Sequence, residues 1–197
     1  QGIQTLVAEH PGRVHAHRLT CNHGAPEYGS TEHPDRMRVL SIVWNATLGV
    51  VDLMQDPHDP LEAFVWVEAD LYWTPETLIA LLEHLETPEV DVVSPMTMLK
   101  GEVACYDIWG ARGVDGVRFG PFPPFHPDYA AAMTGLTSPP YLVEVGSVGS
   151  CLAIRPPYPD VRITNDNAIV GWCQAARAEG ARIWIDTRLR IDHPHAG

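Results

Sequence analysis

The chain has 197 residues, 45% of them hydrophobic, which suits a single domain over residues 1–197 with one substantial core. Its formal net charge of −12 argues against a broad grip on nucleic acid or anionic membranes, both of which need basic surface, although a local basic groove stays open. No apolar run approaches the roughly 20 residues of a membrane span, and the N-terminus lacks a signal-like segment, so we expect a cytoplasmic protein with no membrane span.

The first strong pattern in chain order is a helix that begins at Pro34 and ends near Met54. Before it, residues 1–19 give a weak pattern, and residues 21–31 have the Asn, Gly, Pro and Ser content of a loop. Apolar residues at helical spacing predict the helix, namely Met37, Leu40, Trp44, Leu48 and Val51.

The central feature is the stretch 64–70, an apolar run that ends in Glu68 and Asp70. A run this rich in aromatic and β-branched residues predicts a strand buried on both faces, as in a parallel sheet. Ligands bind at the C-terminal ends of strands in open α/β sheets, so both carboxylates are placed to meet a metal or a phosphorylated substrate. A helix follows, with Thr74 as N-cap, Pro75 at the first helical position and a stripe of leucines at 78, 81, 82 and 85.

The remaining pattern alternates strands and helices. Residues 90–94 predict the next strand, and the short links predict right-handed crossovers and a mostly parallel sheet flanked by helices. Residues 95–140 are less regular and indicate a functional loop region, such as a lid or an acceptor platform. Two strands, 142–145 and 151–154, flank the Gly-rich segment 146–150. A helix capped by Asn165 or Asp166 and closed by Gly180 then precedes a last strand over 182–186.

Several polar side chains suggest chemistry. Glu68 and Asp70 suit a divalent cation, Mn²⁺ or Mg²⁺, and an imidazole from His193 or His195 as third ligand would favour Mn²⁺. The alternative is that the two carboxylates only cap the helix and solvate a loop. Asp166 is a candidate general base, although an N-cap role is favoured on local grounds. The cysteines, Cys21, Cys105, Cys151 and Cys173, lack zinc-site spacing and are expected to be reduced, mostly buried thiols.

These residues together amount to a family resemblance. Glu68-Ala69-Asp70, with the helix that Thr74 and Pro75 open, resembles the Asp-x-Asp motif of GT-A nucleotide-sugar glycosyltransferases. Residues 146–155 are similar to the Gly-rich strand that forms the floor of the acceptor site in this family. Residues 165–186 resemble the family's acidic-pair helix and the strand that follows it. Ile191-Asp192-His193 matches the place of the C-terminal metal-binding His.

Within this family, residues 106–109 and 36–45 look most like the branch of the fungal mannan polymerase subunits and related bacterial and phage sequences. The resemblance implies a Rossmann-like GT-A fold, with two departures. Glu68 stands where the family has its first Asp, which keeps the carboxylate on a longer arm. The family's opening strand, helix and strand do not fit before Pro34, so we expect a truncated N-terminal part or a reduced nucleotide pocket.

The resemblance also implies roles. Asp70 and His193 would bind the metal, and Glu68 would bind the metal or the ribose. Asp166 would act as base in an inverting reaction or orient the acceptor in a retaining one. Residues that would contact the sugar or acceptor are Asp107, Trp109 and Arg112, with Ser147, Gly149 and Ser150 leaving room for substrate. Trp109 as a core residue and Arg112 as a solvated loop charge are the alternatives.

The function implied is metal-dependent transfer of a sugar from a UDP- or GDP-sugar to a hydroxyl acceptor. The alternative is a non-catalytic glycosyltransferase-like domain that binds a carbohydrate or a partner subunit. A metal-dependent hydrolase that uses the same acidic turn is a third hypothesis. Protein, glycan, lipid and modified DNA all stay open as acceptors, with nucleic acid disfavoured by the negative charge.

Overall fold

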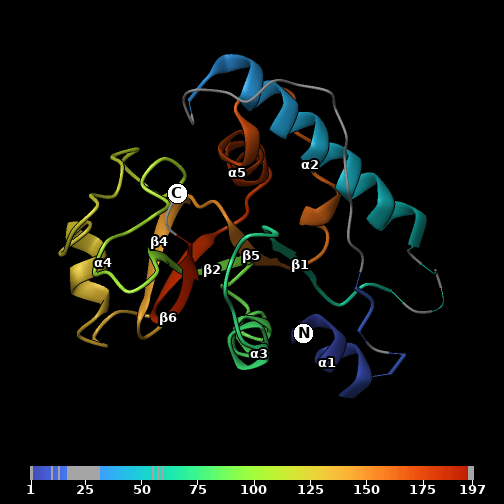
Figure 1. The fold of residues 1–197 in the computed structure, drawn as a ribbon, viewed down its shortest axis with the longest axis horizontal. Coiled ribbons are helices and arrows are strands. Elements are labelled where there is room, and N and C mark those ends of the chain that lie inside the picture. The colour runs from blue at the N-terminus through green and yellow to red at the C-terminus, as the bar shows by residue number, and fades with distance from the viewer. Residues whose placement is uncertain are drawn as a thin grey trace.

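A computed structural model describes residues 2–9, 11–12, 14–16, 32–54, 56, 58 and 60–194 (Figure 1). In chain order the elements are α1 (Gly2–Glu9), α2 (Pro34–Met54), β1 (Phe64–Val67), α3 (Pro75–His84), β2 (Val92–Leu99), β3 (Arg112–Gly113), α4 (Pro127–Ala132), β4 (Leu142–Ser147), β5 (Cys151–Ile154), the 3₁₀ turn η1 (Tyr158–Asp160), α5 (Ala168–Ala178) and β6 (Ile183–His193). The α/β class predicted from the sequence is confirmed.

Within the described ranges the sheet has six strands in the order β1-β5-β2-β6-β4-β3, and it is mixed. Among these strands β2 and β6 pair in parallel, whereas β1 with β5, β2 with β5, β3 with β4 and β4 with β6 are antiparallel. The prediction of a mostly parallel sheet is therefore wrong. β1 and β2 do run in the same direction, as their crossover helix α3 requires, but β5 lies between them and runs the other way.

β1 is an edge strand, and all four of its residues are only partly buried. Its apolar run nevertheless has a clear cause, because both faces of the strand are covered. Phe64 and Trp66 pack against one core cluster, and Val65 and Val67 pack against the other. A strand in this position needs apolar residues on both faces even without a central place in the sheet.

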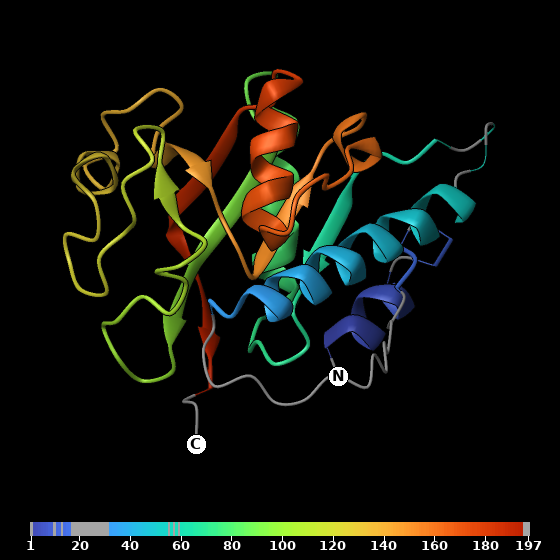
Figure 2. The ribbon, with the colours of Figure 1, turned by 90° about the horizontal axis from the view of Figure 1, so that it is seen from above.

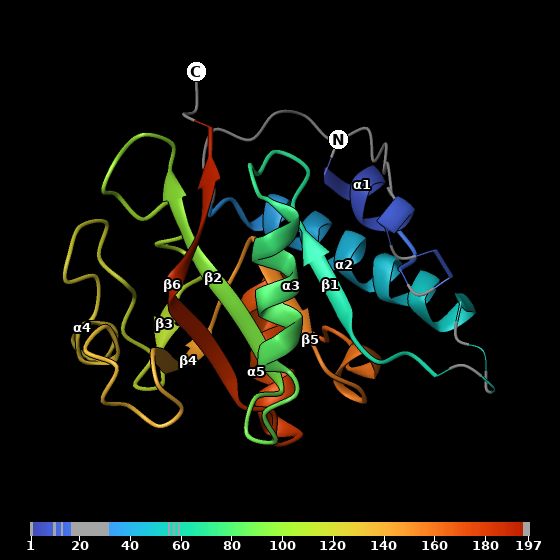
Figure 3. The same cartoon turned by 90° about the horizontal axis from the view of Figure 1, so that it is seen from below.

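Helices cover the sheet on its two faces (Figures 2 and 3). One core lies under α2 and α5, with Trp44, Leu48 and Trp172 among its buried members. The other lies under α3 and α1, with Leu78 and Leu81 fully or nearly fully buried. This three-layer arrangement leaves the ends of the strands free to carry polar groups.

Local helix signals were reliable, with one shift. α2 runs from Pro34 to Met54 and α3 begins at Pro75 after Thr74, as predicted, although the Thr74 side chain makes no capping hydrogen bond. The N-cap of α5 is Asn167 rather than Asn165 or Asp166. The Asn165 side-chain oxygen instead accepts from the backbone N–H of Asn167 at 3.0 Å, forming a turn that delays the helix.

Three strands are longer than predicted, and β4 ends at Ser147 rather than at residue 145. β2 continues through Pro95 to Leu99, and the last strand continues past Asp186 to His193. The β2–β6 register slips at this point, because Pro95 pairs with Asp186 and the next residue of β2 pairs with Arg190. The polar residues in this bulge resemble a strand end in the sequence.

The rest of the region 95–140, predicted as one irregular loop, holds the short elements β3 and α4. Cys105, Cys151 and Cys173 are free and buried as expected, and Cys21 lies outside the described residues.

Candidate functional site

The acidic turn predicted after the first strand lies beside the ends of two other strands. The Glu68 N–H donates to the Ser150 carbonyl at 3.0 Å, which joins the turn to the start of β5. Two residues past Asp70, the backbone of Tyr72 exchanges two hydrogen bonds with Asp192, at 2.7 and 3.1 Å. The turn is therefore fixed between β5 and the last residues of β6.

This placement brings Asp70 and His193 together. The Nε2 atom of His193 lies 3.1 Å from Oδ2 of Asp70, and Nδ1 contacts the carbonyl of Pro194. The imidazole is also stacked on Tyr106, with ring centroids 3.6 Å apart and planes 8° from parallel. Because a carbonyl only accepts, Nδ1–H donates to Pro194, and Nε2 faces Oδ2 of Asp70 either as a second donor, in the doubly protonated ring, or with its lone pair.

Glu68 is the more buried carboxylate of the turn. Burial raises its pKa, and the neighbouring charge of Asp70 raises it further. Arg36, in the first turn of α2, together with the Ser150 side chain and His193, acts in the opposite direction. A cation near Glu68 would likewise stabilise its ionised form against burial and against the charge of Asp70.

A third carboxylate, Asp107, faces the same region from the loop after β2. Burial raises its pKa to about 7, and the charge of Glu68 contributes to this rise. The backbone N–H groups of Gly110, Gly149 and Ser150 stabilise the ionised form and limit the shift. A Cβ atom at Gly149 would overlap the Asp107 carboxylate, so only glycine leaves room for it.

Tyr106 belongs to this group, although the sequence reasoning did not assign it to the site. Its phenol pKa is raised to about 12 by burial and by the charges of Glu68, Asp70 and Asp107. We call Glu68, Asp70, Tyr106, Asp107 and His193 the carboxylate cluster. The resemblance of residues 106–109 and 36–45 to one branch of the family was a signal for both Tyr106 and Arg36, although it assigned neither residue to the site.

Several other predicted site residues make none of the contacts described for the carboxylate cluster. Asp166 is exposed in the turn before α5, and no interaction described for the cluster involves it. Trp109 and Arg112 contact each other, with the guanidinium carbon 6.0 Å from the ring centroid. Ser147 is buried and donates to the Gly110 carbonyl at 2.6 Å, which supports the loop that carries Asp107. His195 lies outside the described residues.

Within the described part of the chain, no group of three His, Cys, Asp or Glu side chains is arranged to hold a metal ion. Asp70 and His193 are a pair with suitable donor atoms, and the charges of both act on Glu68. Carboxylate oxygen and imidazole nitrogen suit Mn²⁺, and a ring whose other nitrogen donates to a backbone carbonyl is typical of a ligating histidine.

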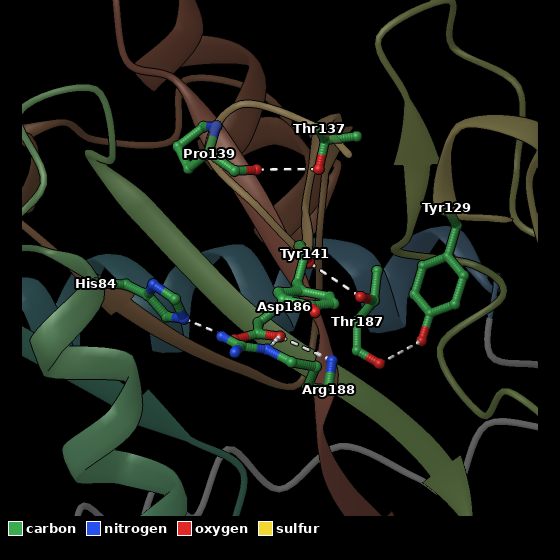
Figure 4. A network of polar contacts seen from close by, with 8 residues as sticks. All are labelled: His84, Tyr129, Thr137, Pro139, Tyr141, Asp186, Thr187 and Arg188. Carbon is green, nitrogen blue, oxygen red and sulfur yellow. Dashed lines mark hydrogen bonds and ion pairs between the residues drawn. The ribbon is translucent and has the colours of Figure 1, made fainter. Parts of the chain in front are cut away.

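A second polar network, which the sequence reasoning missed, fastens α3 to the bulge of β6 (Figure 4). The fully buried Asp186 lies 2.6 Å from Nε2 of His84 and accepts from the backbone and guanidinium of Arg188 at 2.7–3.3 Å. Burial alone would raise the pKa of Asp186, but these partners outweigh it and lower the pKa to about 2. A cavity of about 490 Å³ borders these residues, together with Ala80, Glu83 and Leu189.

No helix in the described ranges is long and apolar enough to cross a membrane. No model of a known protein family matches this sequence, and comparison with curated proteins also gives no match.

Proposed function

We propose that the chain is a metal-dependent glycosyltransferase of the GT-A type, which transfers a sugar from a UDP- or GDP-sugar to a hydroxyl acceptor. The observation that carries this proposal is the contact between Asp70 and His193, 3.1 Å apart. These residues lie more than 120 positions apart and belong to the two motifs that resemble the family's metal ligands.

The chemistry of this pair supports a cation. Nε2 of His193 and Oδ2 of Asp70 lie 3.1 Å apart, a separation that either a proton on Nε2 or a cation bound by both atoms would stabilise. Asp70 and His193 would hold Mn²⁺, or Mg²⁺, with Glu68 as a further ligand or as a contact to the ribose. The cation would stabilise the negative charge that develops on the diphosphate leaving group in the transition state.

The protein's own residues have complementary tasks in this proposal. Stacking on Tyr106 and the Pro194 carbonyl hold the His193 ring in one orientation. Asp107, held by backbone N–H groups, would bind sugar or acceptor hydroxyls, because a carboxylate accepts from two or more of them. Asp166 stays the predicted base, and its exposed position leaves it accessible to an acceptor.

The test is calorimetric titration of UDP and of GDP into the purified chain, with and without Mn²⁺. We expect binding that requires Mn²⁺ and that is lost in the Asp70→Ala variant. Asp160→Ala, which removes an exposed carboxylate in η1, is the matched control and should bind as the unmodified chain does. Absence of nucleotide binding, or binding indifferent to Mn²⁺ and to Asp70→Ala, would refute the proposal. Carbohydrate binding without nucleotide binding would favour the non-catalytic alternative.

A further inference from the structure

Lys100, the only lysine in the chain, lies next to the carboxylate cluster in an unusual setting. Its Nζ atom lies 4.0 Å from the centroid of the Tyr72 ring, and both side chains are exposed, Tyr72 to 53%. An ammonium over an aromatic face is attracted by the ring quadrupole, which positions it without neutralising its charge.

Backbone hydrogen bonds fix both residues to the end of β6. The Lys100 N–H donates to the carbonyl of His193 at 2.9 Å, and Tyr72 exchanges two backbone hydrogen bonds with Asp192. Tyr72 also follows Asp70 by two residues. The lysine and its aromatic partner are therefore attached to the same segments that carry the Asp70–His193 pair.

Among the described residues, no carboxylate matches the charge of Lys100. Arginines elsewhere pair closely, as Arg118 does with Glu32 and Arg190 with Asp192, both at 2.7 Å. Lys100 forms no ion pair within 4.0 Å with any carboxylate in the described ranges. In a chain with net charge −12, an exposed and unmatched ammonium beside an acidic cluster is available to an anionic ligand.

A diphosphate that approaches the carboxylate cluster meets several negative charges. One divalent cation offsets only part of this repulsion, so a further positive group near the cluster would strengthen binding. We propose that Lys100 binds the diphosphate of the nucleotide-sugar donor, with Tyr72 holding the ammonium in position. This inference rests on the function proposed above and adds a donor-binding residue to it.

The first test compares variants by calorimetry with UDP and GDP in the presence of Mn²⁺. Lys100→Met should weaken binding about tenfold, the value expected for loss of one charged hydrogen bond. Lys100→Arg, which keeps the charge, should restore most of the affinity. Arg38→Ala removes an exposed positive charge from α2 and serves as the control for net charge, with no change expected.

The second test needs no variant, because a chain with one lysine gives one side-chain amine for labelling. Pyridoxal 5′-phosphate forms an imine with that amine, borohydride reduces the imine to a stable secondary amine, and peptide mass spectrometry measures the extent at Lys100. UDP or GDP with Mn²⁺ should protect Lys100, and inorganic pyrophosphate with Mn²⁺ should protect it as well.

The outcomes separate the two proposals. If the unmodified chain binds a nucleotide but Lys100 is neither protected nor needed for affinity, the role of Lys100 is refuted and the glycosyltransferase proposal stands. If the unmodified chain binds neither nucleotide, both proposals fail. Protection together with weaker binding in Lys100→Met and recovery in Lys100→Arg supports the inference.

Discussion

Replacing Asp186 with asparagine should destabilise the fold by an amount that depends on pH. The network in Figure 4 lowers the pKa of this buried carboxyl from its ordinary 3.8 to about 2. At about 1.4 kcal/mol per pKa unit, the difference corresponds to about 2.5 kcal/mol of stability for the ionised form. Because the folded-state pKa is the lower one, this stability is fully present well above pH 3.8 and is lost as the pH falls through 2.

Urea unfolding of the unmodified chain and of Asp186→Asn at pH 7 and pH 3 measures this contribution. We expect the two to differ in free energy of unfolding by about 2.5 kcal/mol at pH 7 and by roughly half of that at pH 3. Asp160→Asn, at an exposed position, should differ little from the unmodified chain at either pH. A difference for Asp186→Asn that is the same at both pH values would refute the reasoning.

Further predictions concern the carboxylate cluster and the predicted base Asp166. Gly149→Ala should destabilise the fold by about 1–3 kcal/mol in urea unfolding, because its Cβ would overlap Asp107, whereas Gly49→Ala, with open space in α2, should be neutral or stabilising. His193→Ala should weaken Mn²⁺ binding, measured by electron paramagnetic resonance of the free ion, and an unchanged affinity would exclude this residue as a ligand. If a transfer activity is found, Asp166→Asn should lower kcat with little effect on nucleotide affinity, whereas Asp107→Asn should raise the KM for the acceptor or donor sugar.

Local signals in the sequence predicted the part of the site that one segment provides. Residues 64–75 contain an apolar run, two carboxylates and the Thr74-Pro75 start of a helix. The structure has β1, the acidic turn and α3 where these signals predict them. The proximity of Asp70 and His193 was predicted from the place of His193 after the last strand and from the order of motifs in a resembling family. That proximity is now observed, and the role of the pair as metal ligands stays a prediction.

The remaining features depend on contacts between distant segments. Pairing of β5 between β1 and β2 is set by register across the sheet, which the pattern within each strand does not specify. The sequence pattern places Asp186 at the end of a strand, but its burial against His84 and Arg188 places it inside the molecule. The influence of Arg36 on Glu68 likewise depends on how α2 packs over the sheet.

The strand order also has a consequence for how the chain acquires its fold. Among the described strands, the first two in the chain, β1 and β2, do not pair with each other, and β2 finds its neighbours β5 and β6 only after residue 150. During synthesis these apolar strands therefore stay unpaired until the last quarter of the chain has been made. Contacts of such long sequence separation slow folding and expose strand edges to aggregation. The last quarter of the chain, which carries His193, thus completes the sheet and the carboxylate cluster together.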